Sequence, residues 1–393
     1  MMTPRQTARA RLFPTVFTAA LLAAVYSAAP VRAAQIETLA KQAYMIDAQT
    51  GAVLLDKDGA VPVPPSSMSK MMTVHVVMER IKAGRLSLKD EFLVSEKAWR
   101  MGGSKMFVEL GKKIPVEDLL RGVIIQSGND ATIVLAEGVS GDESAFAELM
   151  NSEAKKLGLK DSNFLNASGW PADGQVVTAR DLAILALSTI RDYPELYKMY
   201  AEKNFTWHGI KQGNRNPLLY MNIGADGLKT GHTEAAGYGL TASAVRNGRR
   251  LILVLNGMSS MRERSQESAR LMEWGFREFN NYAMFKKGEV VDNAAVWLGT
   301  EASVPLVIDQ DVKVTLPRRA SRDAKVSVSF NAPVAAPIAA GKELGKLKIA
   351  VPGATTIELP LKAGKAVERL GFMGRLNAAV SYLLWGNQAS KAK

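Results

Sequence analysis

Residues 65–73 read Pro-Ser-Ser-Met-Ser-Lys-Met-Met-Thr, and this stretch decides the fold around it. Apolar side chains recur at helical spacing from Ser67 to Glu79, and Pro65 with the prolines before it stops the preceding strand. We therefore expect a mostly buried helix that begins at Ser67. Ser67 and Lys70 are three residues apart, so they share one face of that helix and the amine can approach the hydroxyl.

This pair predicts nucleophilic chemistry. A serine hydroxyl needs a base beside it to become a nucleophile at neutral pH. A lysine amine is such a base only when burial and neighbouring positive charge lower its pKa. We expect the helix N-terminus at Ser67 and the ammonium of Lys229 to lower the pKa of Lys70. Ser67 is then the nucleophile and Lys70 the base.

Two further clusters follow in the chain, Ser-Gly-Asn at 127–129 and Lys-Thr-Gly at 229–231. Each motif alone is weak evidence for a function, because S-x-x-K is common at capped helix starts, S-G-N in turns and K-T-G at strand ends. The three in this order are far more specific.

Each member of these two clusters has an expected task. Ser127 bridges the two lysines and passes a proton to the leaving amine. Asn129 positions the substrate and Lys70. Lys229 attracts a carboxylate of the substrate, and Thr230 donates a hydrogen bond to it.

Other chemistries fit less well. The sequence has no G-x-S-x-G elbow for a histidine-based triad and no cysteine, which excludes thiolate chemistry. His75, His208 and His232 are scattered and form no metal-spaced pair, so we expect neither a metal nor another cofactor. We interpret His75 as a packing residue. His232 either shapes the site beside Lys-Thr-Gly or is an ordinary, partly buried histidine.

The first 33 residues are expected to be a secretory signal peptide rather than a buried helix. Three arginines precede an apolar stretch at 16–26 and a small-residue site at 31–33. The mature chain then starts at Ala34. Loss of four arginines and no acid lowers the formal net charge from +12 to +8. A basic exported protein is drawn to anionic surfaces and carboxylate-bearing substrates, and nucleic acid is not expected as a partner.

The remaining chain divides into three parts. Strands come first, helices follow and strands return within 34–283, which predicts a sheet built from distant parts of the chain. Residues 284–362 are rich in valine and alternate, so we expect a small all-β domain there. The elements expected in the first part are a hairpin at 42–56, helices at 67–79, 116–123, 131–139, 143–157, 179–190 and 262–276, and strands at 237–245 and 250–255.

The tail, 363–393, contains an amphipathic helix. Apolar side chains from Phe372 to Leu384 share one side, whereas Arg375 lies away from it. Such a helix lies in a membrane interface with its apolar side in the acyl boundary. The alternative is a helix docked on the body of the protein. The lysines at the end of the chain favour the membrane surface.

Taken together, the chain resembles the low-molecular-mass penicillin-binding proteins, the serine-type D-Ala-D-Ala carboxypeptidases of peptidase family S11. The residues that carry the resemblance lie at 65–73, 122–131, 178–181, 214–219 and 226–233. It extends from about Tyr44 to Leu384. The fold it implies is an α/β transpeptidase/β-lactamase-like domain, an antiparallel sheet flanked by helices, then a small all-β domain and a C-terminal amphipathic helix.

The resemblance also implies the activity and the roles of residues. It makes Ser67 the acyl-enzyme serine, Lys70 the proton acceptor and Ser127 the second active serine. Arg215 helps recognise the terminal carboxylate, and the backbone N–H groups of Ser67 and His232 form the oxyanion hole. Gly231 completes the substrate-binding cluster. The expected substrates are peptidoglycan stem peptides, the expected covalent inhibitors are β-lactams, and the expected place is the periplasmic face of the inner membrane, with the protein held there peripherally.

The chain departs from related lactamases at two points. Its middle motif is S-G-N rather than S-D-N, and serine stands at 162 where class A lactamases carry a deacylating glutamate. Both departures favour a carboxypeptidase and predict slow hydrolysis of β-lactams. A D,D-endopeptidase or weak β-lactamase on the same scaffold is the alternative, and a non-catalytic wall-binding protein is a third reading. Gly102, Gly103 and Ser104 lie in a loop, 100–109, whose effect on activity stays open.

Overall fold

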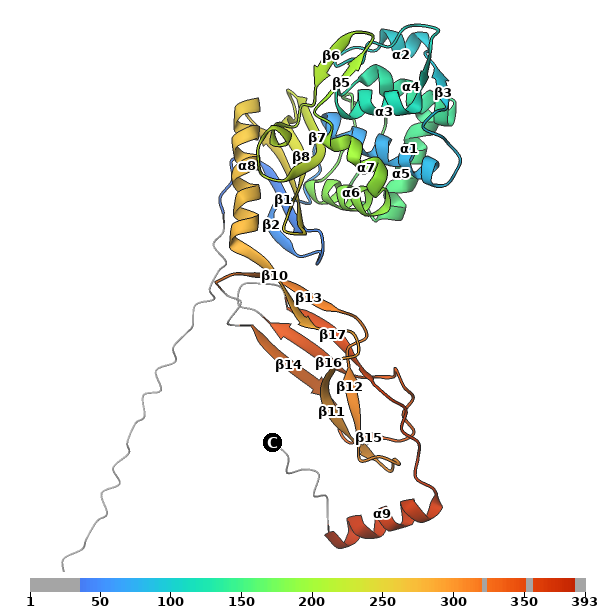
Figure 1. The fold of residues 1–393 in the computed structure, drawn as a ribbon, viewed down its shortest axis with the longest axis vertical. Helices are drawn as coiled ribbons and strands as arrows, with labels where there is room; N and C mark the ends of the chain where they lie inside the picture. The colour runs from blue at the N-terminus through green and yellow to red at the C-terminus, as the bar shows by residue number, and fades with distance from the viewer. Residues whose placement is uncertain (1–35, 320–323, 351–355, 386–393) are drawn as a thin grey trace, which may run out of the picture.

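The computed structural model describes residues 36–319, 324–350 and 356–385. Figure 1 shows a helix-rich domain at one end, an all-β domain below it and a separate terminal helix. The expected signal peptide and the lysines at the end of the chain lie outside the described residues. The predicted fold class, an antiparallel sheet flanked by helices followed by an all-β domain, is confirmed.

The first domain is built on a five-stranded antiparallel sheet with the order β2-β1-β9-β8-β7. The expected hairpin at 42–56 is present and supplies one edge. Strands from the far end of the domain complete the sheet, so distant parts of the chain do meet. The strands are β1 (Gln42–Asp47), β2 (Val53–Lys57), β7 (Ala225–Thr233), β8 (Gly237–Arg246) and β9 (Arg249–Met258).

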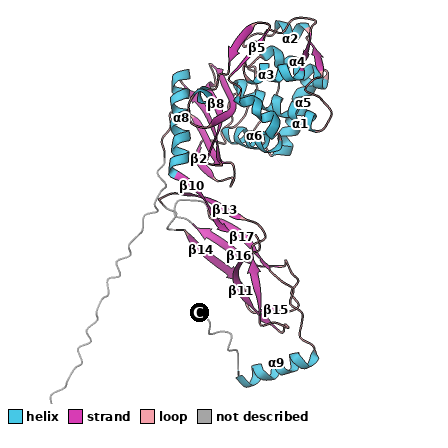
Figure 2. Ribbon diagram, viewed as in Figure 1, coloured by secondary structure: helices cyan, strands magenta, loops and turns pink. Residues whose placement is uncertain are grey.

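Helices occupy the middle of the chain and cover both faces of the sheet (Figure 2). The six longest of them agree with the predicted helices to within a few residues at each end, whereas the short helices at 96–100 and 194–197 were not predicted. The helices are α1 (Lys70–Lys82), α2 (Glu96–Arg100), α3 (Val116–Ile124), α4 (Asn129–Ser140), α5 (Glu143–Leu157), α6 (Ala179–Asp192), α7 (Pro194–Tyr197) and α8 (Met261–Glu278). Short elements join them: η1 (Ser66–Ser69), η2 (Lys198–Ala201), η3 (Pro217–Tyr220), β3 (Glu91–Leu93), β4 (Lys113–Pro115), β5 (Asn204–Trp207) and β6 (Ile210–Gly213).

Both faces of the sheet are buried because its central strands carry apolar residues on each side. In β9, Ile252 and Val254 join the core that contains α1, whereas Leu251, Leu253 and Leu255 join the core beneath α8. Alternate residues of a strand point to opposite faces. A strand covered by helices on both sides is therefore apolar throughout.

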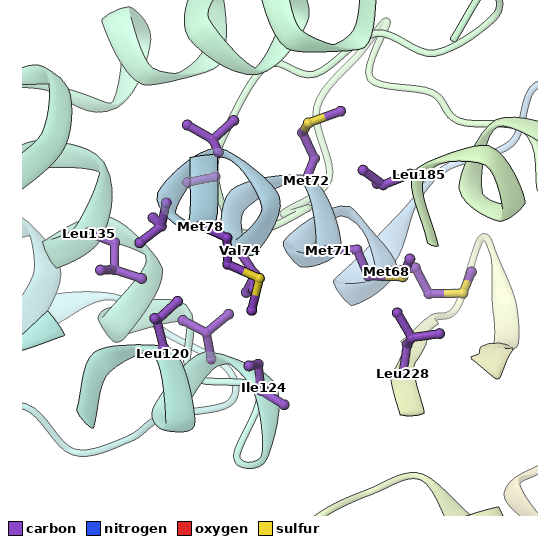
Figure 3. Packing of buried hydrophobic residues seen from close by; sticks show 14 of the residues in the cluster. Met68, Met71, Met72, Val74, Met78, Leu120, Ile124, Leu135, Leu185 and Leu228 are labelled. Carbon is purple, nitrogen blue, oxygen red and sulfur yellow. The ribbon is translucent and has the colours of Figure 1, made fainter. Parts of the chain in front are cut away.

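Helix α1 lies at the centre of the larger core. Figure 3 shows its methionines pointing outward in several directions, toward Ile124 of α3, Leu135 of α4 and Leu185 of α6. The side chains of Met71 and Met78 are completely buried. Unbranched, flexible methionine side chains fill irregular gaps between helices. The part of α1 that follows Lys70 is thus packed against neighbouring helices on all sides.

The start of this helix differs from the prediction. The expected α-helix from Ser67 is preceded by a 3₁₀ turn, η1, and the α-helix proper begins at Lys70. The backbone N–H of Met68 donates to the carbonyl of Pro65 at 3.2 Å, which closes the tighter turn. Ser66 has a φ of 47°, a left-handed conformation immediately before the expected nucleophile.

The second domain contains a six-stranded sheet with the order β14-β16-β17-β12-β11-β15 and a two-stranded sheet of β10 and β13. The expected domain boundary after residue 283 falls inside β10, which pairs with β13 of the second domain. The strands are β10 (Phe279–Phe285), β11 (Val290–Trp297), β12 (Ser303–Val307), β13 (Val312–Pro317), β14 (Lys325–Phe330), β15 (Val334–Ala335), β16 (Glu343–Ala350) and β17 (Ile357–Ala363).

A polar joint fastens the two domains. Asp47 at the end of β1 is fully buried and accepts from Arg249 Nε at 2.7 Å. The guanidinium of Arg249 also donates to the carbonyl of Phe279, at the start of β10, at 2.7 Å. Asn281 donates to the other oxygen of Asp47 at 3.2 Å and accepts from the hydroxyl of Thr315 at 2.8 Å.

The terminal helix, α9 (Phe372–Trp385), is separate from both domains (Figure 1). Its apolar side chains are exposed, with Phe372 at 72% and Leu383 at 83%, so it is not docked on the body of the protein. Within the described residues, no helix combines the length and apolar character needed to span a bilayer.

Candidate active site

Ser67 and Lys70 meet as predicted. Lys70 Nζ lies 2.9 Å from Ser67 Oγ, while Ser67 itself is only partly buried and so is open to a substrate. The amine of Lys70 is completely buried. It also donates to Asn129 Oδ1 at 2.7 Å and to the carbonyl of Ser168 at 2.6 Å. These contacts fix the amine beside the hydroxyl.

Burial lowers the pKa of Lys70 to about 7, because the charged form loses its hydration. The positive charge of Arg215 lowers this pKa further, and the negative charge of Asp130 partly opposes both effects. The predicted direction is therefore correct, and Arg215 is a neighbouring cation that the sequence did not indicate. A substantial fraction of the amine is neutral near pH 7 and can accept a proton.

Ser127 and Lys229 form a second buried pair. Lys229 Nζ donates to Ser127 Oγ at 3.0 Å and to the carbonyl of Thr230 at 3.1 Å. Ser127 has a φ of 61°, which turns its side chain into the site at the end of α3. Ser127 was expected to bridge both lysines, but the hydrogen bond found is to Lys229, and Lys70 reaches Asn129 and Ser168 instead.

Burial lowers the pKa of Lys229 well below its usual value, and the nearby charges of Lys70 and Arg215 add to this effect. Two cations in one water-poor site repel each other. A carboxylate that enters the site would relieve this repulsion and favour the charged form of Lys229. The pair of lysines therefore makes the site attractive to an anion.

Strand β7 lies against the turn that carries the nucleophile. At Gly231, a Cβ atom would come 2.1 Å from Ser66 Oγ and 3.1 Å from Met68 Cγ. Only glycine allows so close an approach. The third residue of the Lys-Thr-Gly motif is thus needed for the contact between β7 and η1, in addition to its expected place in the substrate-binding cluster.

Arg215 and His232 are the two exposed side chains among the predicted site residues. Arg215 reaches solvent and donates from Nη1 to Ser104 Oγ at 2.7 Å, which joins it to the loop at 100–109. His232 is exposed and its ring stacks on Tyr238 with the centroids 3.9 Å apart. The ring of His232 is therefore exposed at the rim of the site and is not a partly buried packing residue. Among the described residues, His, Asp and Glu side chains form no cluster that suits a metal ion.

Sequence reasoning missed Asp130, which follows the Ser-Gly-Asn motif. Its carboxylate is buried and accepts from the backbone N–H groups of Met106 and Phe107 at 2.8 Å, and from that of Val108 at 3.2 Å. It thereby holds the loop before the motif. Asn129 Nδ2 donates to the carbonyl of Gly102 in the same loop at 2.8 Å. The sequence signal for this role is an acidic residue in the first turn of a helix whose other side chains are mostly apolar.

The loop after α5 is the second feature of the site that sequence reasoning missed. Its Ser168 carbonyl accepts from Lys70, and the side chains of Asn166 and Gln175 hold the loop together through bonds to its backbone. Ser162 donates to Asp181 at 2.8 Å, so it is bonded to α6 and not to Lys70. The position at which lactamases carry a deacylating glutamate thus supplies no carboxylate.

Comparison with known proteins identifies the family. The family described as D-alanyl-D-alanine carboxypeptidase, peptidase S11, matches residues 29–260, and the penicillin-binding protein 5 C-terminal domain matches residues 279–369. The chain belongs to peptidase family S11. The D-alanyl-D-alanine carboxypeptidase DacA of Escherichia coli K12 is 37% identical over 375 residues, which are 91% of this S11 peptidase and 93% of DacA.

Solved structures agree. Penicillin-binding protein 5 of Haemophilus influenzae superposes with a TM-score of 0.77 at 37% identity, over 85% of this S11 peptidase and 99% of that chain. Penicillin-binding protein D2 of Listeria monocytogenes, in its ampicillin-bound form, has a TM-score of 0.57 at 30% identity over 61% and 98% of the two chains. A D-alanyl-D-alanine endopeptidase of E. coli K12 is 29% identical over 63% of this chain and 81% of its own.

The packing of the loop on the nucleophile turn gives a test. Gly169 has a φ of +76°, and a Cβ there would lie 1.9 Å from the carbonyl oxygen of Ser66. We predict that Gly169→Ala lowers the free energy of unfolding by about 3 kcal/mol, of which about 1 kcal/mol is the cost of the left-handed backbone. Urea unfolding measures the loss.

Gly158 provides the matched control for this substitution. Its φ is +75° and no atom lies within 4 Å of the position that a Cβ would take, so Gly158→Ala should cost only the backbone contribution. An equal loss in the two variants would contradict the close packing of Gly169 on the nucleophile turn.

Proposed function

We propose that the protein is a serine D-Ala-D-Ala carboxypeptidase that removes the terminal D-alanine from peptidoglycan pentapeptide stems through an acyl-enzyme on Ser67. The observation that carries this proposal is the 2.9 Å contact between a partly exposed serine hydroxyl and a buried amine with a pKa of about 7. Membership of the S11 family and the relative named as D-alanyl-D-alanine carboxypeptidase support the same activity.

In the acylation step, Lys70 accepts the proton of Ser67 while Ser67 Oγ attacks the carbonyl carbon of the penultimate D-alanine. The backbone N–H groups of Ser67 and His232 stabilise the oxyanion that forms. Collapse of this intermediate breaks the peptide bond. The terminal D-alanine leaves as an amine after it receives a proton, which Ser127 delivers from the buried network that contains Lys229. The proton that Lys70 took from Ser67 then passes to this network, which restores it and leaves Lys70 neutral for deacylation.

Deacylation uses the same groups. A water molecule gives a proton to the neutral Lys70 and attacks the ester carbonyl, and the proton returns to Ser67 Oγ as the ester bond breaks. The products are the stem tetrapeptide and free enzyme. Asn129 keeps Lys70 in place during both steps through its 2.7 Å hydrogen bond.

Recognition of the substrate begins at its terminal carboxylate. Lys229, Thr230 and Arg215 offer two basic side chains and a hydroxyl near the nucleophile, and the charge of Arg215 acts on both buried lysines. A free carboxylate next to the scissile bond fits this charge, and an internal peptide bond lacks it. This preference favours a carboxypeptidase over an endopeptidase. The match to the endopeptidase of E. coli covers less of the chain than the match to the carboxypeptidase DacA, which agrees with placing the carboxypeptidase activity first.

β-Lactams are proposed as covalent inhibitors, because their strained amide presents the same carbonyl and carboxylate to Ser67. The ampicillin-bound form of the Listeria relative supports this. Position 162 is a serine whose hydroxyl donates to Asp181 of α6, so residue 162 offers no carboxylate of its own to activate water against the adduct. We therefore expect long-lived acylation rather than efficient hydrolysis of the drug.

We also propose that the protein is exported and held at the periplasmic face of the inner membrane. Residues 1–33 have the order of segments found in a signal peptide. Helix α9 exposes Phe372, Met373, Leu376, Val380, Leu383 and Leu384. A helix with such a face gains stability when it lies in the interface of a bilayer.

The nucleophile is tested by Ser67→Ala, which removes the only atom proposed to attack the carbonyl. We predict a complete loss of covalent labelling by fluorescent penicillin and of D-alanine release from an acyl-D-Ala-D-Ala peptide. Ser69→Ala is the control, since Ser69 lies two residues away and its hydroxyl has no hydrogen bond to a described residue. Labelling that survives Ser67→Ala would contradict the assignment.

The assignment of Lys70 as the base is tested by the pH dependence of the acylation rate. Only the neutral amine of Lys70 accepts a proton, and its fraction rises as pH increases through its pKa of about 7. We predict that the acylation rate increases about tenfold per pH unit below pH 6 and levels off above pH 8. Stopped-flow acylation by penicillin measures it. A rate independent of pH between 5 and 8 would contradict Lys70 as the base.

Membrane association is tested by a chain that ends at Leu370. This truncation removes α9 but keeps Val367, which is buried in the second domain. We predict that it leaves the membrane fraction and still binds penicillin. The double substitution of Phe372 and Leu383 by serine should have the same effect, because both side chains are exposed and neither supports the core. Unchanged membrane recovery would argue against α9 as the anchor.

A further inference from the structure

The second domain ends in an exposed, uncharged segment. Residues 331–340 read Asn-Ala-Pro-Val-Ala-Ala-Pro-Ile-Ala-Ala and contain no acidic or basic side chain. They join β14 to β16 and include β15, which pairs with the end of β11. Figure 1 shows β15 at the end of the second domain farthest from the catalytic domain. The exposed members are Asn331, Ala332, Pro333, Ala335, Pro337, Ala339 and Ala340. We call this segment, together with residues 297–299 and 368–370 beside it, the tip.

The tip also presents a tryptophan. Trp297, the last residue of β11, is 38% exposed and pairs with Ala335. Its carbonyl accepts from the N–H of Ala336 at 2.9 Å, so the sheet fixes its place. An indole ring favours the boundary between a bilayer and water, because most of its surface is apolar and it carries one polar N–H. The tip therefore has the chemistry of a surface that lies in a membrane interface.

The tip is tied directly to the start of α9. The backbone N–H of Leu370 donates to the carbonyl of Leu298 at 2.9 Å, and that of Thr300 donates to the carbonyl of Glu368 at 2.8 Å. One residue, Gly371, separates Leu370 from α9. Neighbouring Cα atoms are about 3.8 Å apart, so α9 begins within about 8 Å of Leu370. The headgroup layer on one side of a bilayer is about 5 to 7 Å thick. A helix lying in that layer therefore brings the tip to the same depth.

The charges around the tip permit this contact. Lys365 and Glu301 form an ion pair, and the exposed Glu368 and Arg369 are neighbours in the chain. Lys342 follows the uncharged segment and is exposed. These five side chains sum to a charge of about +1, so the tip is not repelled by the anionic lipids of a bilayer.

We infer that the tip is a second membrane contact, in which Trp297 and the segment 331–340 lie in the headgroup layer beside α9. The inference rests on the proposed binding of α9 to a bilayer and adds a surface of the folded domain to it. A helix joined through one residue could swing relative to the domain. A second contact on the domain itself removes this freedom and fixes the tilt of the domain on the membrane.

Single cysteines test the contact, because the chain contains no cysteine and each introduced thiol carries the only label. The environment-sensitive fluorophore NBD is attached to Ala335→Cys on the tip, to Ala379→Cys on α9 and to Ser327→Cys on β14, all at exposed positions. Each labelled chain, residues 34–393, is mixed with vesicles of phosphatidylethanolamine and phosphatidylglycerol. We expect the emission at 335 and 379 to shift to the blue and to be quenched by lipids that carry a nitroxide near the headgroup. The emission at 327 should not change.

The three labels separate this inference from the proposed anchor. A change at 379 with none at 335 would show that α9 binds without the tip, which would overturn the inference and leave the anchor in place. If neither label responds, the proposed binding of α9 is wrong and the inference fails with it.

Two substitutions measure what the tip contributes to vesicle affinity. Trp297→Ser removes the indole ring, and Ala335→Asp places a negative charge next to anionic lipids, so each should weaken binding about threefold to tenfold in vesicle sedimentation. Ser327→Asp adds the same charge on β14 and is the matched control, which should bind as the wild type does. Ala335→Asp changes an exposed side chain, so its result stands even if Trp297→Ser destabilises the domain. Wild-type affinity in both tip variants would overturn the inference.

Discussion

The burial of one lysine amine beside one serine hydroxyl is the constraint on which the catalytic domain depends. An amine hidden from water resists protonation, and Lys70 has no exposed surface. It is nevertheless satisfied, since a hydroxyl, a carboxamide and a backbone carbonyl accept from it. These acceptors come from three separate parts of the chain. The reactive state therefore exists only when η1, α4 and the loop after α5 are all in place.

The fold brings the three acceptors of Lys70 together by placing α1 at the centre of the core. Methionine side chains contact neighbours on several sides, and β7 presses on the turn before the helix at a glycine. Asp130 secures the loop in front of the second motif, and that loop holds both Asn129 and Arg215. Arg215 in turn acts on the pKa of both lysines. Packing and electrostatics therefore act on the same few atoms.

Much of this was predictable from the sequence. The helices and most of the sheet follow from apolar periodicity, and the meeting of Ser67 with Lys70 follows from their spacing. Contacts between distant segments did not follow. No local pattern indicates that the carbonyl of Ser168 accepts from Lys70, or that the charge of Arg215 lies near enough to lower its pKa. Ser127 was expected to bond both lysines, and only the bond with Lys229 is found. The position of its side chain depends on a left-handed backbone, which motif spacing does not reveal.

The joint between the domains has a mechanical consequence. Asp47 and Arg249 form a buried ion pair, and Arg249 and Asn281 tie it to the first strand of the second domain. Bending at this joint would break the hydrogen bonds from Arg249 to Phe279 and from Asn281 to Asp47 and leave buried polar groups unpaired, which is costly inside a protein. The all-β domain therefore works as a stiff stalk. If α9 lies on a bilayer, as we propose, such a stalk would hold the catalytic site at a set height above that surface.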